Sequence, residues 1–210
     1  MTERVSRAAD FTRRRLIEAG LARFARHGFD GASVRAIAED AQANQAAIKY
    51  HFGNKDGLYR EVLLEAFATF ERFNALDDEA LAQLTPPQAL EAFLRQNLSA
   101  ILSASDLRHP LGVVNWEIVN RTPVFTQVVA THRIPVFEAA RRIVGLFQPG
   151  LSAEEAALTA VWLVNQPFIF VRNAEQMRHP PVSVTLDEAG VERLGTVLTR
   201  LVRGGLEARA

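Results

Sequence analysis

Apolar residues recur every three or four positions along most of the chain, which is the spacing of amphipathic helices. The first such stripe ends at His27-Gly28, and glycine is typical of a helix C-terminus. Its apolar members are Leu16, Ile17, Ala19, Leu21, Phe24 and Ala25. No run of β-branched residues alternates with polar ones over a useful length, so strand signals are weak. The pattern predicts an all-α chain of about nine helices.

Small polar residues mark the starts of the next two helices, which are short. Ser33 precedes one and Asn44 precedes the other, and both residue types accept hydrogen bonds from the free N–H groups of a helix start. Gly53-Asn54 then interrupts the chain before a long helix that we expect over residues 55–76. We divide the chain near the start of this helix, into an N-terminal domain, residues 1–56, and a C-terminal domain, residues 57–210.

Prolines and a capping box place the later helices. Proline suits the first turn of a helix, and Ser152 with Glu155 three residues later forms a capping box. The chain breaks again at residues 148–150 and in a loop over residues 178–181. The expected helices cover residues 86–103, 111–120, 123–147 with a kink at Pro135, 152–173 and 187–204.

Residues 33–55 have the spacing of a helix-turn-helix. Two short helices flank a tight turn at Gln42-Ala43, and Ala38 and Ile48 are small or apolar where the helices must cross. In such a motif the second helix places its N-terminal residues at base edges in the major groove of DNA. The sequence therefore predicts a helix-turn-helix whose second helix begins at Asn44-Gln45.

The same segment resembles the DNA-binding domain of the TetR family. The resemblance covers about residues 11–64. In chain order it includes the segment from His27 to Val34, the pair Ile37-Ala38, an aromatic-rich tetrad and Lys55. The amino-acid sequence of residues 46–59 is similar to that of the CecR-like branch of the family. The resemblance implies a C-terminal helical bundle that encloses a ligand cavity, and a homodimer formed by the last two long helices.

Chemistry and resemblance together assign the candidate DNA contacts. Gln45 can pair with adenine through two hydrogen bonds, and Arg35 favours guanine. The resemblance places the cluster at the end of the second helix on phosphates, and Lys55 at the next helix start would form a phosphate site with free backbone N–H groups. The predicted DNA-binding residues are Ser33, Arg35, Asn44, Gln45, Ala46, Lys49, Tyr50, His51 and Lys55.

Structural roles remain open for some of these residues. Tyr50 fits a core aromatic as well as a DNA contact, His51 fits packing beneath the long helix, and Lys55 fits a solvated helix start. Phe52 we assign to the core. The sequence also departs from the family pattern at Gln42, where a turn glycine is usual, and at Lys49, where an aromatic residue is common. The turn must therefore tolerate a side chain.

Charge is distributed unevenly although the formal net charge is zero. Residues 1–60 hold eleven basic and seven acidic side chains, so the N-terminal end is the part suited to a polyanion. Five arginines precede the first stripe, and they fit either an arm on the DNA backbone or a loose, solvated tail. They are Arg4, Arg7, Arg13, Arg14 and Arg15.

The C-terminal two thirds predict a dimer interface and a ligand pocket. Residues 152–173 are apolar nearly all round, which fits either a dimer interface or a central core helix of a monomer. Polar and aromatic residues are scattered among the apolar positions, as in small-molecule sites. The predicted ligand-binding residues are Trp116, Phe137, Trp162, Asn165 and Gln166. The weaker candidates are Glu117, Asn120, Arg121, His132 and Arg133.

The sequence lacks the motifs that are typical of several function classes. The chain has no cysteine, no Gly-rich phosphate loop, no Gly-x-Ser-x-Gly and no histidine pair at helical spacing, so we expect no enzyme, cofactor or metal site. We also expect no secretory signal and no membrane span, and hence a cytoplasmic protein. The sequence predicts a repressor that a small-molecule effector releases from a palindromic double-stranded DNA operator. The alternative is a constitutive or activating DNA-binding regulator without a small-molecule inducer.

Overall fold

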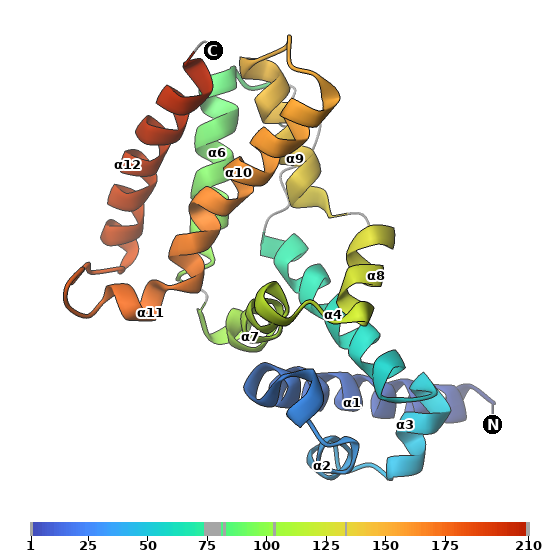
Figure 1. The fold of residues 1–210 in the computed structure, drawn as a ribbon. Coiled ribbons are helices and arrows are strands. Elements are labelled where there is room, and N and C mark those ends of the chain that lie inside the picture. Colours follow the sequence, from blue (N-terminus) through green and yellow to red (C-terminus); the bar gives the residue numbers. More distant parts are fainter. Residues whose placement is uncertain (1, 74–80, 82, 103, 133, 209–210) are drawn as a thin grey trace. The chain divides into compact units, whose positions relative to one another are not determined.

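The computed structural model describes residues 2–73, 81, 83–102, 104–132 and 134–208 (Figure 1). Within these residues every regular element is a helix, so the all-α prediction is confirmed. The helices are α1 (Thr2–Gly31), α2 (Val34–Asp40), α3 (Gln45–Phe52), α4 (Lys55–Phe73), α6 (Pro86–Ser99), α7 (Ala104–Asn120), α8 (Pro123–Thr131), α9 (Pro135–Phe147), α10 (Ala153–Arg172), α11 (Ala174–Met177) and α12 (Glu188–Glu207). No helix of the described residues is long and apolar enough to cross a bilayer.

Several predicted helix boundaries are wrong, since α6 ends at Ser99 rather than at residue 103 and α12 continues to Glu207 rather than ending at residue 204. The single helix expected over residues 123–147 is two helices, because the backbone at His132 and Ile134 is extended and Pro135 occupies the first turn of α9. The helix expected from residue 111 already begins at Ala104, with Pro110 inside it. Proline removes one backbone donor, and the rest of α7 retains its helical form around that loss. The short helix α11 was not predicted.

Packing divides the chain into two compact units. The first comprises Met1–Phe70 and Asp106–Arg133, and the second comprises Glu71–Ser105 and Ile134–Ala210. The first unit therefore joins the predicted helix-turn-helix to α7 and α8, which come much later in the chain. The predicted division at residue 56 stays a prediction.

An aromatic cluster forms the centre of the first unit. The rings of Phe24 and Tyr59 meet edge to face at 4.6 Å between centroids, and Phe29 lies 4.9 Å from Tyr59. Phe24 and Tyr59 are fully buried, and such aromatic pairs contribute beyond the apolar area that they bury. The cluster joins α1 to α4. Further buried members of this core are Leu16, Ile37, Ile48, Leu58, Val62 and Leu63.

A buried carboxylate connects α4 to α7 and α8. Glu117 on α7 has no exposed surface and accepts hydrogen bonds from the Tyr59 hydroxyl at 2.6 Å, the Thr122 hydroxyl at 2.7 Å and the Thr122 backbone N–H at 2.8 Å. Burial and the neighbouring carboxylate raise the pKa of Tyr59 far above its usual range, so the phenol stays a donor. Three donors offset the cost of removing this carboxylate from water.

Trp116, the neighbour of Glu117, packs against the end of α1. A β-carbon on Gly28 would lie 2.1 Å from the Trp116 indole ring, so only glycine leaves room for the ring. Gly28 also has a φ of +67°, which interrupts the regular helix at the predicted position before the chain continues to Gly31. Consecutive residues of α7 thus contact both α1 and α4.

The second unit is a helical bundle in which α6 packs against α9, α10 and α12. Its core comes from one face of each helix, including Leu90, Phe93, Ile143, Leu163 and Leu198. The predicted capping box at Ser152 and Glu155 is confirmed, since the Ser152 N–H donates to the Glu155 carboxylate at 2.8 Å. The Gln148 amide also donates to the Leu206 carbonyl at 2.9 Å, which fixes the end of α12.

Gly28→Ala should lower the free energy of unfolding by about 2 to 4 kcal/mol, because it adds left-handed strain to a clash with Trp116. Urea titration followed by circular dichroism measures this loss. Gly145→Ala is the matched control, since its new β-carbon enters open space on α9 and should raise stability by up to about 1 kcal/mol. Equal effects of the two substitutions would contradict the proposed contact.

Tyr59→Phe should cost about 1.5 to 3 kcal/mol of stability, because Glu117 loses a donor in a buried position. The control is Tyr50→Phe, which changes a side chain that is 81% exposed and should shift stability by less than about 0.5 kcal/mol. The same urea titration compares them. A neutral Tyr59→Phe would mean that the hydrogen bond to Glu117 contributes nothing.

Candidate nucleic-acid interface

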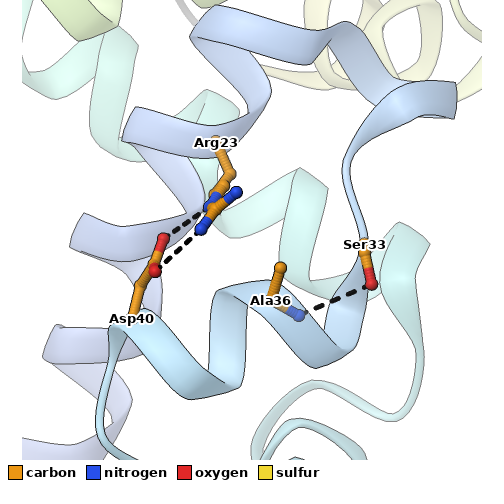
Figure 2. A network of polar contacts seen from close by, with 4 residues as sticks. All are labelled: Arg23, Ser33, Ala36 and Asp40. Atoms are coloured by element: carbon orange, nitrogen blue, oxygen red, sulfur yellow. Dashed lines mark hydrogen bonds and ion pairs between the residues drawn. The ribbon is translucent and has the colours of Figure 1, made fainter.

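Helix α2 is fixed at both ends by polar contacts (Figure 2). Ser33 caps it as predicted and accepts a hydrogen bond from the Ala36 N–H at 3.5 Å. At the other end, Arg23 of α1 binds both oxygens of Asp40, at 2.5 and 2.9 Å. The hydrogen bond from Arg23 holds the pKa of Asp40 below its ordinary value. The orientation of α2 against α1 is therefore set by a bidentate ion pair.

Helix α3 has one buried side and one exposed side. Ile48 is 2% exposed and packs inward, as predicted for the helix crossing. Asn44 caps the helix and accepts from the Ala46 N–H at 2.8 Å. The exposed positions are Gln45, Ala46, Lys49 and Tyr50. This helix is therefore held by its apolar side and presents amide, cationic and phenolic groups to solvent, which is the arrangement of a recognition helix.

The turn between α2 and α3 adopts the strained conformation that the sequence implied. Gln42 has a φ of +47°, in the left-handed region that glycine prefers. The Gln42 side chain is fixed by a hydrogen bond, because Arg15 of α1 donates to the Gln42 amide oxygen at 2.8 Å. The turn therefore tolerates a side chain.

Lys55 and His51 lie where α3 meets α4. The Lys55 ammonium donates to the Asp30 carbonyl at 3.2 Å and lies 4.7 Å from the centre of the Phe29 ring. Lys55 therefore links the start of α4 to the end of α1, and its phosphate contact stays a prediction. His51 is half-buried with its ring 4.9 Å from that of Tyr50. Tyr50 is exposed, so the alternative of a core aromatic is wrong.

Phe52 is half-buried rather than a full core residue, which corrects the sequence assignment. The Arg13 guanidinium covers its ring at 5.6 Å and also forms an ion pair with Glu61 of α4. The Phe52 carbonyl lies so close to Gly57 that a β-carbon there would be 1.9 Å away. Gly57 thus permits the tight junction between α3 and α4, a role that the sequence analysis missed.

Arg35, the predicted guanine contact, is exposed and forms an ion pair with Glu39 one turn along α2. The pair joins Nε of Arg35 to the Glu39 carboxylate at 2.8 Å. This hydrogen bond and the Glu39 charge raise the pKa of Arg35. Glu39 was not predicted as a partner of Arg35, although its spacing of four residues from Arg35 is a recognisable signal.

The predicted ligand-binding residues occupy different surroundings. Trp162 and Asn165 lie on the exposed side of α10, where the Asn165 amide donates to the Val161 carbonyl. Phe137 and Gln166 are half-buried on α9 and α10, which pack against each other. Trp116 lies in the first unit, against Gly28.

Some of the weaker ligand candidates also have local partners. Glu117 is satisfied by Tyr59 and Thr122, and the His132 ring stacks on Phe67 at 5.9 Å. Arg133 lies outside the described residues. Two adjoining grooves between α6 and α12 have volumes of about 180 and 430 Å³, and none of the predicted ligand residues lines them. The described residues bring no three His, Cys, Asp or Glu side chains together at a possible metal site. The ligand assignments stay predictions.

The fold and this site define a helix-turn-helix protein with a helical body. Solved structures share that architecture: a TetR-like transcriptional regulator from Rhodococcus superposes with a TM-score of 0.67 at 19% identity, covering 94% of this chain and 97% of its own. A putative transcriptional regulator from Pseudomonas aeruginosa PAO1 gives 0.67 at 24% identity, covering 92% and 91%. At these identities the likeness concerns the fold.

Sequence comparison matches the N-terminal part of the chain to a known family. The profile described as "Bacterial regulatory proteins, tetR family" matches residues 16–62. The HTH-type transcriptional repressor SCO4008 of Streptomyces coelicolor is 43% identical over 28% of this chain and 30% of its own length. The HTH-type transcriptional repressor NicS of Pseudomonas putida is 28% identical over 70% of this chain and 65% of its own. Residues 16–62 of this chain therefore form a TetR-family N-terminal domain.

These matches span less than two thirds of each of those relatives, and the SCO4008 match spans under one third. The shared part with the higher identity is the length of a helix-turn-helix domain. Assignment to the CecR-like branch stays a prediction.

Gln42→Gly should be more stable than Gln42→Ala by about 1 kcal/mol, because both lose the bond to Arg15 while only alanine keeps the left-handed strain. Urea titration of the two variants at equal protein concentration gives this difference. Equal stabilities would show that the turn in solution does not hold Gln42 at positive φ.

Proposed function

We propose that this chain is a sequence-specific DNA-binding transcriptional repressor that acts as a homodimer. The observation that carries the proposal is α3, which is held by buried Ile48 and exposes Gln45, Lys49 and Tyr50 together. Repression is the activity that the names of SCO4008 and NicS give for those relatives. The operator is chromosomal DNA, so the proposed place of action is the cytoplasm.

In the proposed complex α3 enters the major groove. Gln45 in its first turn pairs with adenine, and the exposed Arg35 of α2 pairs with guanine. Glu39 binds Nε of Arg35 and leaves the terminal guanidinium nitrogens available to pair with a base. Lys49 and Tyr50 contact the phosphates at the other end of the helix, and Ser33, Asn44 and Ala46 complete the surface.

An exposed apolar stripe supports the proposed homodimer. On α10 it contains Leu158, Val161, Trp162 and Ile169, which are 65%, 48%, 40% and 45% exposed. On α12, Leu201 is 62% exposed, and Trp162 lies against Gly205 so closely that a β-carbon there would be 3.1 Å away. The stripe therefore continues from α10 to α12. A second copy of the chain that packs its own stripe here forms a four-helix interface with two-fold symmetry.

The effector part of the proposal rests on the family and on the helical body. An effector that favours one conformation of the dimer changes the distance between its two α3 helices. Operator half-sites lie about 34–36 Å apart along DNA, so a change of that distance weakens binding to both half-sites at once. Phe137 and Gln166, half-buried on adjoining helices, are the residues that we propose for the effector's apolar and polar groups.

Selection of bound DNA from a random duplex library tests the proposed function. We expect a palindrome, and Gln45→Ala should relax base preference at one position of each half-site and cost about 1 to 3 kcal/mol there. Lys49→Gln is the matched control, because it should weaken all sequences alike and reduce the salt slope by about 2, one unit for each copy of Lys49 in the dimer. Folded protein that enriches no sequence would contradict the proposal, and unchanged preference in Gln45→Ala would contradict the role of Gln45.

A further inference from the structure

The beginning of α1 lies outside the segment that matches the family. The profile starts at residue 16, whereas α1 starts at Thr2 and continues regularly as far as Gly28. Residues 2–15 carry five arginines and two acidic residues. The alternative of a loose tail is therefore wrong, since this segment is a helix about 20 Å long. A helix fixes which of the arginines can act together.

Four residues of this segment share one side of the helix. Arg7, Phe11 and Arg14 are spaced by four and three positions, and Arg15 follows Phe11 by four. Arg7 and Arg14 are exposed, and Phe11 is 62% exposed. The Arg15 guanidinium lies 5.6 Å from the centre of the Phe11 ring. We call these four residues the arginine face. The side chain of Arg4 lies outside the described part of the chain.

Arg13 points to the other side and is already engaged. Its guanidinium pairs with Glu61 on α4 and covers the Phe52 ring. Arg14, its neighbour, has no hydrogen bond or ion pair to any described residue and is exposed. Two adjacent arginines thus differ in what they contact, although each contributes the same charge.

Two contacts place this part of α1 beside the recognition helix. Arg15 donates to Gln42 in the turn that precedes α3, and Arg13 covers Phe52, the last residue of α3. The residues before Arg13 continue past α3, and Figure 1 shows the N-terminal end of α1 beyond it. The arginine face therefore lies beside the proposed DNA contacts and extends further in the same unit of the molecule.

We propose that the arginine face is a second DNA-binding surface, which contacts backbone phosphates that flank each operator half-site. Guanidinium groups bind phosphate oxygens in pairs, and several on one helix face match the repeated charges of a duplex. The chosen partner is DNA rather than an anionic membrane, because Arg15 holds the turn that leads into α3. This inference rests on the proposed function.

The test compares Arg14→Gln with Arg13→Gln in the full chain. Binding is measured between 50 and 200 mM salt on a selected operator with ten extra base pairs on each side. Arg14→Gln should reduce the salt slope by about 1.8, because the dimer loses one phosphate contact at each half-site, and adding Arg7→Gln should double that reduction. Arg13→Gln should leave the slope unchanged, with circular dichroism confirming that it is folded. On the operator without its flanks, Arg14→Gln and the natural chain should have the same slope.

Failure of this inference differs from failure of the proposed function. If the natural chain binds its operator and Arg14→Gln leaves the slope unchanged, or Arg13→Gln lowers it equally, the arginine face is not a DNA contact. If Arg14→Gln instead loses binding to vesicles of anionic phospholipid while its DNA slope is unchanged, the face binds membranes and our proposal is overturned. If the natural chain selects no DNA at all, both proposals fail.

Discussion

The buried carboxylate of Glu117 is the constraint on which the first unit depends. A carboxylate without exposed surface requires donors, and it receives them from Tyr59 on α4 and from Thr122 at the start of α8. Tyr59 in turn packs its ring on Phe24 of α1. One hydrogen-bonded group thus fixes α4, α7 and α8 relative to the helix that supports the helix-turn-helix. Displacement of any of these helices would leave a charge without partners in the core.

The exposed side of α3 follows from that framework. Because α1 and α4 are fixed, Ile48 can be buried between neighbours while Gln45 and Tyr50 remain in solvent. The polar contacts of Arg23 with Asp40 and of Arg15 with Gln42 then set the angle of α2 and of the turn. The side chains proposed to contact DNA are consequently presented on a rigid support, which lowers the entropic cost of ordering them on binding.

Local sequence signals predicted many of the helix starts. Ser33 and Asn44 cap helices as the sequence indicated, because capping depends only on nearby backbone groups. Pro135 misled the assignment, since proline inside an apolar pattern fits both a kink and the first turn of a new helix. The role of Glu117 could not be predicted, because its bond to Tyr59 joins residues 58 positions apart. Trp162 was assigned to a pocket from its residue type, whereas its exposure depends on how α10 packs.

In the proposed complex, the two α3 helices of a dimer occupy successive major grooves of one operator. Dimethyl sulfate footprinting of the bound, selected duplex tests this directly, since the reagent methylates guanine N7 in the major groove and adenine N3 in the minor groove. We expect protection of guanine N7 at two patches centred about 10 base pairs apart on one face of the duplex. Protection of adenine N3 alone, or of a single patch, would contradict it.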